Sequence, residues 1–157
     1  MDQPLTIEVV DEALALVGVR GVTRSDAART ATFGPWVEAP SFRVTVIVPD
    51  NSPVLVVRAQ PGVGFLPEDR PELLVACNAW HGQHRWPRLT IVDRGGVLMI
   101  ESDVQVPCPA GLDVDQTAAI IASFVAATHE FWTHMTTGVN PIDGILAGAA
   151  ELLDTVD

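Results

Sequence analysis

Apolar residues recur along this chain at two spacings, one typical of helices and the other of strands. In residues 5–17 they lie three or four positions apart, which predicts an amphipathic helix that ends before Gly18. Its apolar face is expected to include Leu16 and Val17. Residues 41–48 alternate between apolar and polar side chains instead, which predicts a half-buried strand.

Further strands are predicted on both sides of residues 41–48. The polar stretch 23–32 suggests one or two short edge strands around a turn, and residues 54–58 suggest a more uniformly apolar strand. Residues 86–92 and 97–106 are expected to form a hairpin across an Asp-Arg-Gly-Gly loop. Short connections favour an antiparallel sheet, and a parallel sheet with alternating helices fits this order less well.

A long helix at residues 113–137 carries the clearest signals. Asp113 is its predicted N-cap, and Gln116 stands where it completes a capping box. The apolar stripe of this helix consists of Ile121, Phe124, Thr128, Phe131 and Met135. Asn140 and Pro141 then open a last amphipathic helix, as an N-cap followed by proline in the first turn.

One more helix is predicted at residues 67–80, and Gly82 is expected to end it before His84. Strands joined by short turns, with helices gathered on one face of the sheet, predict an α+β fold. We expect one domain over residues 1–138 and a helical extension of the same domain over residues 139–157.

Composition and charge narrow the classes of partner. The chain has 157 residues, 48% apolar and 18% charged, which is a globular balance. Its net charge of −11 combines 20 acidic residues with 9 basic ones, all arginine, and no stretch gathers the arginines together. Nucleic acids and anionic membranes require clustered cations, so we expect neither as a partner. An acidic surface suits solubility or a protein with basic segments.

The cellular compartment is predicted from two features that are not found in the sequence, a membrane span and a signal peptide. No window reaches the roughly 18 consecutive apolar residues of a membrane span, and the start, Met1-Asp2-Gln3-Pro4, is not basic as a signal peptide would be. We therefore expect a cytoplasmic protein. Cys77 and Cys108 fit that compartment as free thiols, and a disulfide between them stays open.

Candidate chemistry is concentrated in Cys77, His81 and His84, which would share one face of a continuous helix as metal ligands can. Spacing places no fourth ligand and no acid to orient a histidine, so packing is favoured over a metal site. His129 and His134 lie five positions apart, whereas a zinc-protease helix needs four. No nucleophile elbow or phosphate loop is present. We predict no metal, no cofactor and no catalytic residue.

Around Trp80 the sequence resembles a known family. Asn78-Ala79-Trp80-His81 and Arg85-Trp86-Pro87-Arg88 resemble the signature of YbjN-domain proteins, and Gly111-Leu112 with Gln116 continues the match. The resemblance runs from about Leu5 to Met135. It implies a fold similar to the small dimeric chaperones of type III secretion, and family members are labelled sensory-transduction regulators without established catalytic residues. The motif residues are assigned a packing role: Asn78, Trp80, His81, Trp86, Pro87, Gly111 and Gln116.

Three functions remain open at this point. The favoured one is a non-enzymatic protein-interaction module, chaperone-like or regulatory, with a protein partner of unknown identity and a homodimer as a further possibility. The second is a small-ligand sensor with a pocket between sheet and helix. The third, less supported, is an enzyme that uses the corner formed by Cys77, His81 and His84.

Overall fold

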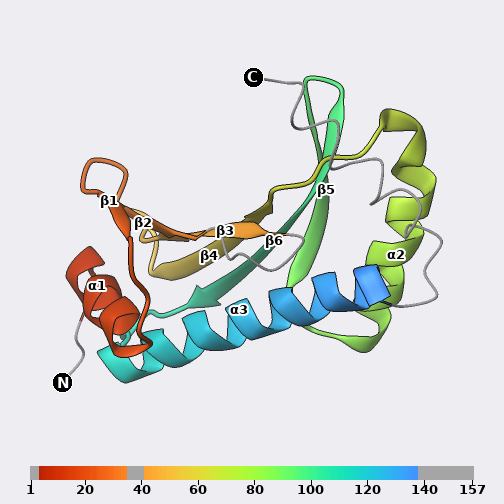
Figure 1. Ribbon diagram of the computed structural model, residues 1–157. Helices are drawn as coiled ribbons and strands as arrows, with labels where there is room; N and C mark the ends of the chain where they lie inside the picture. The colour runs from red at the N-terminus through yellow and green to blue at the C-terminus, as the bar shows by residue number, and fades with distance from the viewer. Residues whose placement is uncertain (1–3, 35–40, 138–157) are drawn as a thin grey trace.

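The computed structural model describes residues 4–34 and 41–137. Within them the chain forms an antiparallel sheet and three α-helices (Figure 1). The elements are α1 (Ile7–Leu16), β1 (Thr23–Ser25), β2 (Thr30–Phe33), β3 (Phe42–Ile47), β4 (Val54–Pro61), α2 (Arg70–Gln83), β5 (Arg88–Arg94), β6 (Val97–Pro107) and α3 (Val114–Thr137). The predicted final helix, opened by Asn140 and Pro141, lies outside the described residues.

The sheet has the strand order β1-β2-β3-β4-β6-β5, and every pairing is antiparallel. This confirms the predicted sheet and excludes the parallel alternative. Figure 1 shows that the sheet is strongly curved, with the β5–β6 hairpin standing steeply above the other strands. Helix α3 runs along one face of the sheet, while α1 lies near its beginning and α2 near its end.

The core lies between that face and α3. The alternating apolar residues of β3 are buried there, as the sequence predicts. Alternate residues of β4 and β6 are buried as well, although residues 54–58 are predicted to be more uniformly apolar. All five residues of the predicted stripe on α3 are buried, which confirms this helix as the cover of the sheet. Asp113 and Gln116 form the predicted capping box: the Gln116 N–H donates to Asp113 Oδ1 over 2.8 Å, and the Asp113 N–H donates to Gln116 Oε1 over 3.1 Å.

Several element ends differ from the prediction, among them β5, which runs from Arg88 to Arg94 and so takes two residues of the predicted Asp-Arg-Gly-Gly loop. β4 continues past Arg58 to Pro61, because the alternation of buried and half-buried residues continues and pairs with β3. α2 continues through Gly82 to Gln83, so Gly82 does not end the helix. A glycine in a helix costs only about 1 kcal/mol relative to alanine, and the His84 N–H closes the last turn on the Trp80 carbonyl over 2.9 Å.

The buried face of α1 is also rotated from the predicted one. Its core residues are Ile7, Val9, Val10, Ala13 and Leu14. Leu16 and Val17, which the spacing assigned to the core, are exposed, Leu16 by 59%. Gly18 then takes a positive φ of 76°, which a glycine adopts readily, and ends the helix as predicted.

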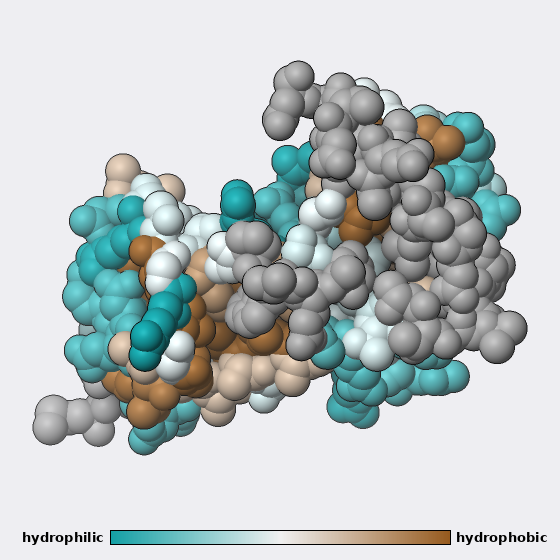
Figure 2. Space-filling model, viewed as in Figure 1, coloured by the Kyte–Doolittle hydropathy of each residue, from teal (hydrophilic) through white to brown (hydrophobic). Residues whose placement is uncertain are grey.

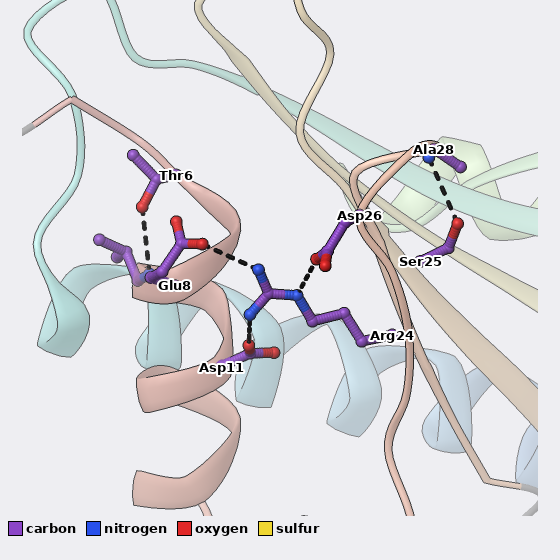
Figure 3. A network of polar contacts seen from close by, with 8 residues as sticks. Thr6, Glu8, Asp11, Arg24, Ser25, Asp26 and Ala28 are labelled. Carbon is purple, nitrogen blue, oxygen red and sulfur yellow. Dashed lines mark hydrogen bonds and ion pairs between the residues drawn. The ribbon is translucent and has the colours of Figure 1, made fainter.

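A charged cluster ties α1 to the first strand (Figure 3). The Arg24 guanidinium on β1 contacts the carboxylates of Glu8 and Asp11 on α1, and that of Asp26 beside its own strand. Backbone hydrogen bonding first, and Arg24 second, lower the pKa of Glu8. The cluster is exposed to solvent, so we assign it an orienting role for α1 rather than a large stabilising one.

Candidate interaction surface

An open groove lies between the end of α1, the sheet and the middle of α3, and we call it the apolar groove. Its volume is about 410 Å³. Its lining residues are Val17, Val19, Phe33, Phe42, Ile121, Ala122, Val125, Ala126 and His129. Eight of these nine are apolar. Figure 2 shows the corresponding hydrophobic surface between α1 and α3.

The groove exists because a sharp turn and small side chains leave space over the sheet. Gly18 turns the chain at the end of α1, so Val17 and Val19 form one wall instead of entering the core. Ala122 and Ala126 lie one turn apart on α3 and are exposed. Because their side chains are only methyl groups, they fill little of the space on the α3 side of the groove. The result is a hollow that apolar side chains of another molecule can fill.

Sequence reasoning offered a pocket between sheet and helix but none of the residues that line this groove. Val17 is predicted to be in the core, although it is exposed and lines the groove. The spacing of Ala122 and Ala126 was the available signal, since two exposed alanines one turn apart beside a buried stripe mark a low helix surface.

A second apolar surface lies on the outer side of α2. Leu74 and Val75 are exposed there, Val75 by 63%, and Leu66 just before the helix is exposed as well. Their neighbours Leu73, Ala76 and Cys77 are buried against the core, so α2 carries apolar side chains on both sides. Large exposed apolar side chains grouped on one helix mark a candidate contact surface.

Two motif residues of α2, Trp80 and His81, connect this helix to its neighbours. Trp80 is buried, stacks on the His84 ring with centroids 3.6 Å apart, and meets the Phe131 ring edge-on at 5.3 Å. His81 Nε2 accepts a hydrogen bond of 2.9 Å from the Leu89 N–H at the beginning of β5. These contacts join α2 to α3 and to the edge strand.

The other motif residues lie apart from that junction or beside it. Asn78 is exposed on α2, and the described residues offer its side chain no hydrogen bond to a neighbouring strand. Pro87 is buried after a cis peptide bond from the partly exposed Trp86. Gly111 has a positive φ of 84° in the turn before α3, and Gln116 belongs to the cap of that helix. The motif therefore forms no single pocket.

The corner of Cys77, His81 and His84 lacks the features of a reactive site. Burial raises the pKa of the Cys77 thiol to about 11, so the thiol stays protonated at neutral pH. His81 already accepts a backbone N–H, and His84 has left the helix with an extended backbone. Over residues 4–34 and 41–137, no group of three histidine, cysteine or acidic side chains is placed to hold a metal. No helix among the described residues has the length and apolar character to cross a membrane.

Comparisons with known proteins agree with this fold. A family model described as "YbjN: Putative bacterial sensory transduction regulator" matches residues 6–136. None of the curated proteins compared with the chain matches it. Among solved structures, "YbjN, a putative transcription regulator from E. coli" has a TM-score of 0.67 at 10% identity, covering 85% of this chain and 95% of the other.

Two further structures share the fold. A chain of the ExsC–ExsE complex has a TM-score of 0.52 at 20% identity, covering 85% of this chain and 96% of its own. A chain of the HopA1–SchA chaperone–effector complex has a TM-score of 0.50 at 13% identity, covering 80% and 90%. At these identities the likeness shows the fold, and it confirms the predicted α+β class with a chaperone-like architecture.

Proposed function

The chain belongs to the YbjN family, whose model spans most of its length, and from this we propose that it is a non-enzymatic protein-interaction module, chaperone-like or regulatory. Its apolar groove would take apolar side chains of a protein partner. The observation that carries this proposal is the groove itself, an open apolar hollow on an otherwise strongly acidic protein. We place the protein in the cytoplasm and assign it no cofactor, metal, nucleic acid or membrane partner.

The shared fold supports a partner of protein type. Two of the similar structures are complexes, one titled as a chaperone with its effector. The net charge of −11 favours a partner segment that carries lysine or arginine beside its apolar residues. The last turn of α1, at the edge of the groove, contains no basic residue, so its carbonyl ends add to the attraction for a cation.

Arginine in the groove is expected to abolish partner binding. The double variant Ala122→Arg/Ala126→Arg would fill the hollow with long side chains and place two cations where apolar anchors and basic residues must enter. Both positions are exposed on α3, so the fold should persist. A partner captured from native extract with the wild-type chain should bind the variant at least about tenfold more weakly in titration calorimetry, a loss of about 1.4 kcal/mol.

Ala119→Arg is the matched control, because Ala119 is exposed on the same helix but does not line the groove. It should bind like the wild type. Unchanged affinity of the double variant, or an equal loss with Ala119→Arg, would remove the groove from the proposal.

A small-ligand sensor is the second candidate, and the size of the groove favours it. A volume of about 410 Å³ lies within the range of small-molecule sites, roughly 300–1,000 Å³. A ligand that binds only the folded chain raises its melting temperature. A thermal-shift screen with apolar small molecules separates this function from the first, provided that the groove variant cancels any shift.

We also propose that the chain forms a homodimer through the outer side of α2. A two-fold dimer uses one surface twice, so the exposed Leu66, Leu74 and Val75 would form the apolar centre of its interface. The expected mass in light scattering at micromolar concentration is twice 16.8 kDa. Leu74→Glu/Val75→Glu should return the mass to that of one chain, because like charges would meet across the axis.

Leu16→Glu is the control for this prediction, since it exchanges another exposed leucine for an acid on α1. Its mass should equal that of the wild type. A wild-type mass that stays at 16.8 kDa as the concentration rises would contradict the dimer.

A further inference from the structure

The face of the sheet turned away from α3, which we call the open face, gathers arginines that are scattered in the sequence. It carries four of the nine arginines of the chain, namely Arg43, Arg58, Arg88 and Arg94. Each alternates along its strand with residues that face the core. Among the residues that the structure describes, two acids, Glu101 and Asp103, share this face, so these six charged side chains sum to four minus two, or +2, on a chain of −11.

Both acids on the open face are already paired. Asp103 accepts two hydrogen bonds from Arg88, of 2.7 and 2.6 Å, which form a bidentate pair. Glu101 Oε1 accepts from Arg94 over 2.5 Å and from Gln60 over 3.1 Å. Both carboxylates are buried. The acids of β6 therefore make their arginine hydrogen bonds with β5, and Arg58 of β4, which stands directly opposite Asp103 in the register, makes none with it.

Arg43 and Arg58 are the two that remain. Among the described residues, neither side chain makes a hydrogen bond or an ion pair. Arg58 stands opposite Thr45 in the register of β3 and β4, and Arg43 lies two residues before Thr45 on the same face. Such diagonal neighbours are about 7–8 Å apart at their Cα atoms, within reach of long side chains. The hydroxyl groups of Thr45 and Thr32 lie 3.0 Å apart beside them.

The local charge outweighs the overall charge at this place. At physiological ionic strength the screening length is about 8 Å, so a group bound between two guanidinium groups responds mainly to them and to Asp103 opposite Arg58. The sheet curves so that the β5–β6 hairpin rises beside the open face, which makes this face concave (Figure 1). In Figure 2 the outline of the molecule dips beside that hairpin, and hydrophilic residues colour part of the dip.

We propose that the open face binds an acidic segment of another protein, with an aspartate or glutamate carboxylate held between Arg43 and Arg58. Guanidinium groups match carboxylates in geometry as well as in charge, and two of them around one carboxylate supply several parallel N–H donors. The hydroxyl groups of Thr32 and Thr45 would form hydrogen bonds with backbone or side-chain groups on either side of that carboxylate. This surface is separate from the apolar groove, which lies on the opposite side of the sheet.

The test uses the full-length chain and a fluorescently labelled peptide of alternating glutamate and serine, followed by fluorescence anisotropy. Saturable binding is expected, and it should weaken as salt is added. Arg43→Gln/Arg58→Gln should bind about tenfold more weakly or not at all. Arg20→Gln/Arg70→Gln removes the same charge from two exposed arginines elsewhere and should bind within about twofold of the wild type.

Circular dichroism and the urea midpoint of each variant establish that the fold is retained, which is expected because Arg43 is exposed and Arg58 is half-buried on a polar face. The proposal is overturned if the wild-type chain shows no saturable binding, or if both double variants lose affinity equally. It is also overturned if a glutamine–serine peptide binds as well as the glutamate–serine one. Displacement of the peptide by an equal concentration of inorganic phosphate would reassign the site from a carboxylate segment to phosphate.

Discussion

Replacing Trp80 by alanine is expected to lower the free energy of unfolding by about 3–5 kcal/mol. The side chain is only 4% exposed, and its ring packs against His84 and Phe131 at the junction of α2 and α3. Truncation would leave a cavity that these two rings cannot close, because His84 is held through its own ring to the Trp80 carbonyl at 3.2 Å. Urea unfolding followed by circular dichroism measures the loss.

Trp80→Phe separates packing from hydrogen bonding at this position. The indole N–H is buried, and within the described part of the chain it finds no hydrogen-bond acceptor. Phenylalanine would therefore remove volume without breaking a bond, and about 1–2 kcal/mol is expected for that change. Equal losses for Trp80→Phe and Trp80→Ala would show that the N–H is essential, and a loss below about 1 kcal/mol for Trp80→Ala would contradict the packing role.

The sheet and α3 could be predicted because their signals are local and strictly periodic. Every second residue from Phe42 to Val48 is buried, and the two sides of a strand cannot be exchanged without exposing the whole set. The cap of α3 is equally local, since Asp113 and Gln116 bond to each other across three residues. In such segments the sequence alone determines which face is buried.

The face of α1 and the candidate sites could not be predicted in the same way. Leu16 and Val17 fit a helical apolar spacing, but Gly18 ends the helix there and the core contacts follow Ile7, Val10 and Leu14 instead. The apolar groove depends on what the end of α1, β2, β3 and α3 leave unfilled. The size and shape of that unfilled space depend on packing between segments that are distant in the sequence, and no pattern within one segment predicts them.

The grouping of charged residues on the open face could not be predicted from the sequence either. Arg43 and Arg58 are fifteen positions apart in the sequence, and only the register of β3 and β4 makes them neighbours. His81 is a further example. Its spacing suggests a metal ligand, whereas the fold uses its Nε2 to accept the first outward N–H of the edge strand β5. A helix-end histidine thus covers part of an edge that would otherwise be open to pairing.

The stability of the protein is expected to fall by about 2–3 kcal/mol between pH 9 and pH 11 because of Cys77. Burial raises the pKa of this thiol from 9.0 to about 11 in the folded chain. Below pH 9 the thiol is protonated in both states and its contribution is complete. Above pH 9 the unfolded chain loses the proton first, so rising pH favours unfolding until the folded thiol also ionises near pH 11.

Urea midpoints measured across this range test the prediction, and the composition makes the window unusually clean. The chain has no lysine and no tyrosine, so the two cysteines are the side chains whose ordinary pKa values fall within it. Cys77→Ala should flatten the dependence on pH. A wild-type midpoint that stays constant from pH 9 to pH 11 would show an accessible Cys77 thiol, and it would return the corner of Cys77, His81 and His84 to the list of candidate reactive sites.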